Sequence, residues 1–191
     1  MKKTMKGINE QASTISVADP KLMQVVVDFA TPASLDLLPR ADVVFSCLGS
    51  TIKKAGSREA FRAVDHDAVV TLARAAREKG ARAFLHVTAL GASAKSPVFY
   101  NTVKGEVEDA VSRVGIQSVY AFRPSILDGE RQESRPGERI GLMAMRVLAP
   151  VLGKYRPTPV EALAKAMIAL AEKPVPGSHV VEADAILRIG S

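Results

Sequence analysis

Three side chains between Phe84 and Glu108 carry the groups of a proton-transfer site. Thr88 ends an apolar run, and Tyr100 and Lys104 stand four residues apart in a stretch typical of a helix. Residues with this spacing share one helix face, so the phenol and the ammonium are neighbours. Because an ammonium favours the phenolate, we expect the pKa of Tyr100 to lie below its ordinary value of about 10. Such a set moves a proton onto or off a substrate oxygen while a hydride moves on carbon.

The same spacing also occurs on ordinary solvent-facing helices, and taken alone it favours that plainer interpretation. The surrounding elements change the balance. Apolar, β-branched runs predict strands at 14–17, 23–27, 42–47, 83–87, 117–122 and within 178–189. Helical spacing predicts a short piece at 35–38 and helices at 59–79, 100–115, 140–152 and 158–171, the last opened by a capping box at Thr158 with proline in the first helical position.

Strands that alternate with helices predict an α/β fold, a doubly wound parallel sheet with helices on both faces. Ligands of such sheets bind beyond the carboxyl ends of the strands. The residues expected at those ends are Asp28, Cys47-Leu48-Gly49, Thr88 and Arg123-Pro124. The proton-transfer set therefore lies on the edge where a ligand is expected, which favours the catalytic interpretation.

Composition indicates one globular domain over residues 1–191, with 1–13 expected to be disordered. The 191 residues are 47% hydrophobic, and the net charge of +6 is spread along the chain without an aromatic-interleaved basic cluster, so we expect no nucleic-acid partner. No apolar run is long enough to span a membrane. Cys47 is the single cysteine, which excludes an intrachain disulfide and points to the cytoplasm.

Other single residues favour plain structural roles. We expect Cys47 to be buried at its strand end and His86 to lie in the core or on the sheet face. The Asp65-His66-Asp67 cluster is expected on the solvated face of its helix. His66, His86 and His179 lack the spacing of metal ligands, so no metal site is predicted.

Several motifs together resemble a known family. They are VVVDF, CLGST, KAGS, the Val64-Asp65 pair, YNTVKGEVE and FRPSILDGERQESRPGE. They are similar to atypical or extended short-chain dehydrogenases/reductases, and more narrowly to the Tat-interacting-protein-like oxidoreductases, a NAD(P)-binding, nucleoside-diphosphate-sugar epimerase-like group with a Rossmann-like fold. The resemblance covers about residues 21–172.

The resemblance implies a role for each matching residue. Tyr100 is the general acid/base, Lys104 holds the nicotinamide ribose and lowers the pKa of Tyr100, and Thr88 orients the substrate oxygen. The implied cofactor-binding residues are Asp28, Phe29, Leu48, Gly49, Lys104 and Pro124. Arg131 and Arg135, within a substrate-side segment at 126–157, bind an anionic substrate or close the site; solvated loop charges paired with neighbouring glutamates are an equal alternative.

The chain departs from the family at one motif. The glycine-rich loop G-x-x-G-x-x-G, which lets the backbone approach the cofactor pyrophosphate, is not in the sequence. Truncation at the N-terminus is the favoured explanation; a real variant refilled by residues 1–17 and a strand supplied by a partner are the alternatives. The cofactor is NADP or NAD, with a lean towards NADP, and its binding is the open question.

The sequence therefore leads to two hypotheses about function, which belong to different classes. The first is an NAD(P)-dependent oxidoreductase, a reductase or epimerase-like enzyme that acts on a small-molecule carbonyl or alcohol. The second is a catalytically impaired regulatory or protein-interaction module that keeps the fold. A homodimer or a protein partner stays open in both.

Overall fold

The computed structural model describes residues 19–128 and 156–191. The chain divides into two compact units, residues 1–40 and residues 41–191. The second unit contains every strand of the main sheet and both members of the Tyr100–Lys104 pair.

A four-stranded sheet forms the centre of the second unit, and all of its strands are parallel. In spatial order the strands are β1 (Val43–Ser46), β2 (Ala83–Val87), β3 (Ser118–Arg123) and β6 (Gly177–Glu182). A separate two-stranded ladder joins β4 (Leu127–Asp128) to β5 (Thr158–Pro159). The carboxyl ends of the four main strands share one edge, as the alternating pattern predicted.

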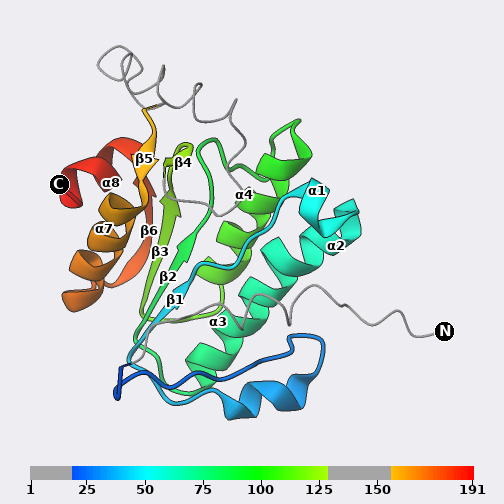
Figure 1. Cartoon of the computed structure of the whole chain (residues 1–191), viewed down its shortest axis with the longest axis vertical. Helices are drawn as coiled ribbons and strands as arrows, with labels where there is room; N and C mark the ends of the chain where they lie inside the picture. Colours follow the sequence, from blue (N-terminus) through cyan, green and yellow to red (C-terminus); the bar gives the residue numbers. More distant parts are fainter. Residues whose placement is uncertain (1–18, 129–155) are drawn as a thin grey trace. The chain divides into compact units, whose positions relative to one another are not determined.

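Helices cover both faces of the sheet (Figure 1). One face carries α3 (Ala68–Glu78) and α4 (Phe99–Ser112); the other carries α7 (Val160–Glu172) and α8 (Ala183–Ile189). Short helices α1 (Ile52–Ala55) and α2 (Arg58–Arg62) follow β1. This is a Rossmann-like doubly wound α/β fold, so the predicted fold class is confirmed.

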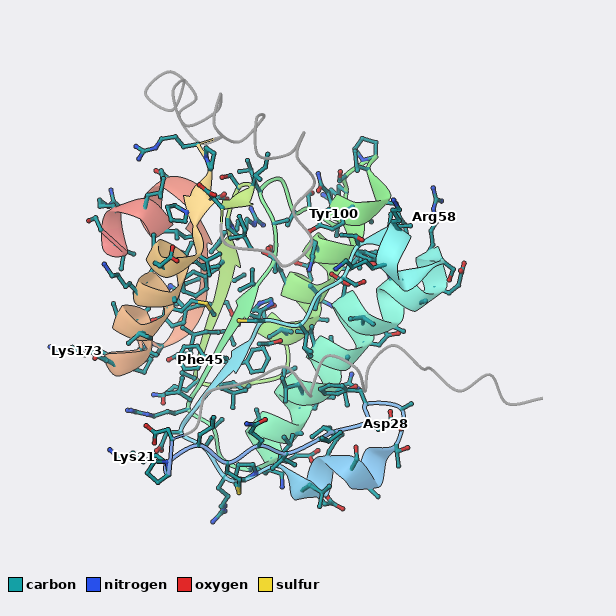
Figure 2. All side chains as sticks on the ribbon, viewed as in Figure 1. Lys21, Asp28, Phe45, Arg58, Tyr100 and Lys173 are labelled. Atoms are coloured by element: carbon teal, nitrogen blue, oxygen red, sulfur yellow. The ribbon has the colours of Figure 1, made fainter. Side chains whose placement is uncertain are left out.

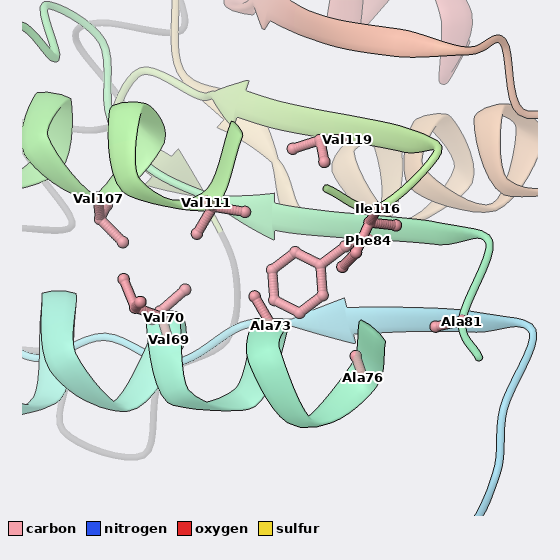
Figure 3. Close-up of a cluster of buried hydrophobic side chains, with 10 residues drawn as sticks. All are labelled: Val69, Val70, Ala73, Ala76, Ala81, Phe84, Val107, Val111, Ile116 and Val119. Atoms are coloured by element: carbon pink, nitrogen blue, oxygen red, sulfur yellow. The ribbon is translucent and has the colours of Figure 1, made fainter. Parts of the chain in front are cut away.

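The core under α3 and α4 is built from small and branched side chains around one aromatic ring. Phe84 of β2 is fully buried between valines and alanines of the two helices (Figure 3). Val103, Val107 and Val111 recur every fourth residue of α4, so they form one buried stripe that fixes which side of α4 faces the sheet. The opposite face of α4 is thereby left for polar side chains.

A π-helical turn interrupts the helix predicted at 59–79. Residues Ala63–Asp67 form this turn between α2 and α3, and the helix ends at Gly80, whose φ of 87° suits glycine. The prediction is right in extent, but it missed both the turn and the short helix α1. The turn contains Asp65, which lies in the candidate site.

Two predicted details near the C-terminus are corrected. Thr158 does not cap α7, because its side chain is fully buried and its hydroxyl accepts a hydrogen bond from the Ser125 amide at 3.2 Å. The strand expected within 178–189 ends at Glu182, where α8 begins. The helix predicted at 140–152 and the strand at 14–17 lie outside the described residues.

The strand predicted at 23–27 is wrong. The structure shows no ladder there, and Met23 and Val26 are 64% and 60% exposed. A strand needs a neighbour for its backbone groups, and the described residues 19–40 contain no other strand. What forms instead is a turn at Asp28 and a 3₁₀ helix at Pro32–Leu37, which agrees with the short helical piece expected nearby.

β1 lies at one edge of the four-stranded sheet. Phe45 is 44% exposed, and Cys47, which follows the strand, is exposed too, contrary to the buried position expected for it. Side chains two apart point to the same face of a strand, so the two residues share this uncovered face.

Candidate active site

Tyr100 and Lys104 lie on consecutive turns of α4, at the end of the helix that meets the carboxyl edge of the sheet. The Lys104 ammonium sits 5.9 Å from the centre of the Tyr100 ring. Tyr100 is half-buried, whereas Lys104 is only 4% exposed. The structure therefore brings the predicted phenol and ammonium together, with the ammonium withdrawn from solvent.

Asp65 holds this buried ammonium. Its Oδ1 lies 2.7 Å from Lys104 Nζ, and its Oδ2 accepts a hydrogen bond from the Ser50 amide at 2.8 Å. Asp65 is fully buried, so the expectation of a solvated Asp65-His66-Asp67 cluster is wrong for its first member. A buried charge needs a partner, and Asp65 and Lys104 supply one to each other.

Gly49 completes this corner of the site. A Cβ atom there would lie 3.4 Å from Asp65 Oδ1 and 3.6 Å from Lys104 Nζ. A Cβ atom at this position would contact both members of the ion pair, and glycine leaves that space free. The predicted cofactor residue Gly49 thus lies beside the predicted Lys104.

The pKa of Tyr100 shifts opposite to the prediction. Burial raises the pKa of Tyr100, and the negative charge of Asp65 raises it further. The expected lowering by Lys104 fails because burial of the phenol disfavours the phenolate and because Asp65 lies against the ammonium. Burial also raises the pKa of Asp65, against the opposing effect of the Lys104 charge.

Aromatic contacts hold the Tyr100 ring against the π-containing helix. Phe61 is fully buried, with its ring centre 5.5 Å from that of Tyr100 and 6.0 Å from that of Phe99. Arg58 lies over the Phe99 ring at 5.0 Å, and Figure 2 shows Arg58 and Tyr100 towards the same end of the fold. These contacts limit the positions that the phenol can take.

The hydroxyl of Thr88 forms hydrogen bonds with Glu108 and Phe122 rather than with Tyr100 or Lys104. It donates to Glu108 Oε1 at 2.6 Å and lies 3.1 Å from the carbonyl oxygen of Phe122, with the side chain 5% exposed. Glu108 stands two helical turns beyond Tyr100, roughly 12 Å along the axis. The substrate-orienting role of Thr88 stays a prediction, and the observed contacts are those of a structural hydroxyl.

Glu108 of α4 and Arg123 of β3 form a second, partly buried ion pair. Arg123 donates from Nε to Glu108 Oε1 at 3.0 Å and from Nη2 to Oε2 at 2.5 Å, a two-bond arrangement. Its Nη1 also donates to Glu182 at 3.0 Å. The hydrogen bonds to Glu108 are the main reason why the pKa of Arg123 is raised above its ordinary value. The network joins α4 to the ends of β2, β3 and β6.

The remaining predicted site residues belong to several parts of the chain. Leu48 packs partly against the core under α3, and Pro124 is buried after β3. Asp28 and Phe29 belong to the first unit, where the Asp28 carboxylate accepts hydrogen bonds from Ala30 and Thr31 at 2.9 Å. Arg131 and Arg135 lie outside the described residues, so their roles stay predictions.

The sequence did contain a signal for Asp65. Phe61, Asp65, Val69 and Ala73 follow one another at intervals of four, and all are buried. A carboxylate inside an apolar stripe requires a buried cation, and Lys104 was already a candidate. Glu108 gave the same kind of signal, one residue after Val107 and four after Lys104.

Residues 19–128 and 156–191 contain no group of three His, Cys, Asp or Glu side chains able to hold a metal ion. Nor does any helix in these ranges have the length and apolar character needed to cross a bilayer.

Solved structures place the fold in a known class. The chain superimposes on RMD from Pseudomonas aeruginosa complexed with NADPH with a TM-score of 0.62 at 19% identity, over 91% of this chain and 73% of that one. It matches the enzyme WbmH of Bordetella bronchiseptica, in complex with NAD+, with a TM-score of 0.62 at 17% identity, over 87% of this chain and 62% of that one. The fold is that of NAD(P)-binding Rossmann-like proteins.

Proteins with similar sequences identify a smaller group of relatives within this fold class. The chain is 36% identical over 150 residues to the protein HTATIP2 of Rattus norvegicus, over 78% of this chain and 62% of that protein. It is 36% identical over 118 residues to the mitochondrial protein fmp52 of Emericella nidulans, over 62% of this chain and 49% of that protein. The chain is thus homologous to the HTATIP2 and Fmp52 proteins, which confirms the predicted Tat-interacting-protein-like resemblance. No protein-family model matches it.

The relatives differ from this chain in length, and several of their names give a location in the cell. The chain spans about half the length of the fungal proteins it matches. Several of those fungal proteins are named mitochondrial, including that of Candida albicans, and this finding overturns the expected cytoplasmic location. The expectation rested on one cysteine, and a cysteine count reports redox conditions rather than an address within the cell.

Proposed function

We propose that this chain carries the proton-transfer half of an NAD(P)-dependent oxidoreductase of the short-chain dehydrogenase/reductase type. The observation that supports it most is the Lys104 ammonium, buried, anchored by Asp65 and adjacent to Tyr100. Burying an ion pair is a poor way to stabilise a fold, since apolar residues of similar volume do as well or better. Retaining one beside a half-buried phenol points to chemistry.

The raised pKa of Tyr100 favours one direction of reaction. Its phenol stays protonated at neutral pH and can donate that proton to a carbonyl oxygen as negative charge develops there. The proposed reaction is therefore the reduction of a small-molecule carbonyl to an alcohol. Lys104 binds and orients hydroxyl groups near Tyr100, because its ammonium has three donors and Asp65 takes only one.

The residues present fit one part of a nicotinamide dinucleotide. Lys104 offers donors for ribose hydroxyls, and Gly49 leaves the space beside the ion pair open. Leu48 and Pro124 offer apolar contact. When bound, the dinucleotide would supply the hydride. RMD was solved with NADPH and WbmH with NAD+, so these neighbours support both forms of the cofactor and choose neither.

The test of this mechanism is Tyr100→Phe. The variant removes the proton and leaves the ring contact with Phe61. We expect the rate of cofactor oxidation with a panel of carbonyl substrates to fall by about 10²- to 10⁴-fold. Cofactor affinity should stay within about twofold. Unchanged turnover in this variant would rule out Tyr100 as the acid.

The second candidate is a regulatory or protein-interaction module. The absence of the G-x-x-G-x-x-G motif from this sequence supports it, because that motif is what lets backbone amides approach a pyrophosphate. In that case Tyr100→Phe has no measurable effect, since there is no turnover to lose. For either function, the names of the fungal relatives support a mitochondrial location, which imaging of a tagged chain can test.

A further inference from the structure

Two buried polar side chains on the α3–α4 face of the sheet take no part in the proposed chemistry. They are Ser46 of β1, 2% exposed, and His86 of β2, 1% exposed. They are partners in the parallel register of the two strands, so their side chains leave the same face. The preceding pair on that face, Val44 and Phe84, packs into the core under the helices.

Neither side chain has a hydrogen-bond partner in the described part of the protein. The unmatched atoms are Ser46 Oγ and both ring nitrogens of His86. Each buried polar group left in this way costs about 1–3 kcal/mol, which is a large fraction of the stability of a domain. Ser46 Oγ and one ring nitrogen of His86 lie on neighbouring strands, and a ligand shared by these two atoms explains them better than two separate defects do.

The charge state of His86 defines what that ligand can be. Burial, followed by the nearby Lys104 charge, lowers the pKa of His86 to about 3. The ring is therefore neutral at physiological pH and has one N–H donor and one acceptor nitrogen. Ser46 adds a hydroxyl that can donate or accept. This set matches a small neutral molecule that both donates and accepts hydrogen bonds.

We propose that Ser46 and His86 bind an internal water molecule on the α3–α4 face of the sheet, near the Asp65–Lys104 pair. Neighbouring strands stand roughly 4.8 Å apart, so paired side chains can be too distant for a direct hydrogen bond and close enough for one water to bridge them. This site depends on no step of the proposed reaction. It would exist in an enzyme and in a regulatory module alike.

A double-mutant cycle tests the bridge through stability. Ser46→Ala, His86→Leu and the double variant are unfolded in urea. Each single change should raise the unfolding equilibrium constant by about tenfold, and the double variant should be little worse than either single one, because each change already releases the water. A more stable His86→Leu variant, or two effects that simply multiply, would overturn the proposal.

NMR of the unmutated chain gives an independent answer if His86→Leu does not fold. Magnetisation transfer from water to the His86 ring protons should show a long-lived contact, with the signal assigned by selective labelling. Ser46→Ala should remove this transfer while the amide spectrum shows a folded protein. Absence of the transfer in the unmutated chain would contradict the proposal.

Discussion

Helix α4 contributes to two ion pairs one turn apart, one buried and one partly buried, and they differ in how completely they are satisfied. Glu108 receives two hydrogen bonds from Arg123 and one from Thr88, and Arg123 reaches Glu182 as well. Lys104 has Asp65 alone as its ion-pair partner among the described residues. The guanidinium of Arg123 donates its hydrogen bonds to Glu108 and Glu182 within the fold. The ammonium of Lys104, in contrast, keeps N–H donors that a ligand can bind.

This difference assigns separate tasks to the two pairs. The Glu108–Arg123 pair fixes α4 to the ends of three strands, and so sets where Tyr100 lies. The Asp65–Lys104 pair holds a charge beside that phenol. Changes to the first should act mainly on stability, and changes to the second mainly on ligand binding.

The largest effect is expected where both pairs are disturbed at once. Gly105 lies between them, and a Cβ there would stand 2.1 Å from the Ala94 amide nitrogen and 2.2 Å from the Ser93 carbonyl carbon. Backbone cannot yield as a flexible side chain does, so Gly105→Ala should lower the free energy of unfolding by about 3 kcal/mol or more. Urea unfolding measures it, with the exposed Ser112→Ala on the same helix as the control. A loss below about 1 kcal/mol would show that the loop at Ala94 is not held as described.

The next effect separates the pairs. Glu108→Gln leaves Arg123 with Glu182, and the Arg123 side chain is 21% exposed, so we expect a loss of about 2 kcal/mol rather than the full 3–5 of a buried pair. Glu106→Gln, whose half-exposed carboxylate meets Arg62, is the matched control and should change stability by less than about 0.5 kcal/mol. Equal effects of the two changes would remove the structural role assigned to Glu108.

A smaller effect distinguishes the pairs by pH. The pKa of Asp65 is raised above its ordinary 3.8, so the native state holds a proton that the unfolded state has released. The contribution of Asp65 to the free energy of unfolding is therefore complete below pH 3.8. It falls as the pH rises from there through the raised native pKa, by no more than about 1.4 kcal/mol per pH unit. Asparagine does not titrate, so Asp65→Asn should gain on the unmutated chain over that window. Parallel pH curves would contradict the assigned burial of Asp65.

Sequence reasoning predicted the sheet and the Tyr100–Lys104 pair because both are local patterns. Strand β2 matched its prediction at both ends, since an apolar run bounded by a turn has few alternatives. The partners of α4 were missed for the opposite reason. Asp65 reaches Lys104, and Glu108 reaches Arg123, only after crossovers bring distant segments together. The predicted shift of the Tyr100 pKa was wrong because it considered Lys104 without the burial of the phenol and without Asp65.

The prediction at 23–27 was also wrong because a local pattern does not show which distant segments are available as partners. These residues have strong strand propensity, and residues 19–40 provide no neighbour to pair with them. Propensity for a strand is a preference for a half-buried, paired surface and does not create that surface. Helices in contrast form their backbone hydrogen bonds within one segment. This is why the extents of α3 and α4 agree closely with the helices that the sequence predicted.

The central claim is that the Asp65–Lys104 pair holds donors for a nicotinamide dinucleotide. Calorimetric titration of the unmutated chain, Lys104→Met and Glu106→Gln with NADPH and with NADH, up to millimolar cofactor, tests it most directly. Circular dichroism should first show that each variant is folded. We predict saturable binding of at least one cofactor to the unmutated chain and to Glu106→Gln, and binding at least tenfold weaker to Lys104→Met. Equal binding by Lys104→Met, or no binding by the unmutated chain, would contradict the claim.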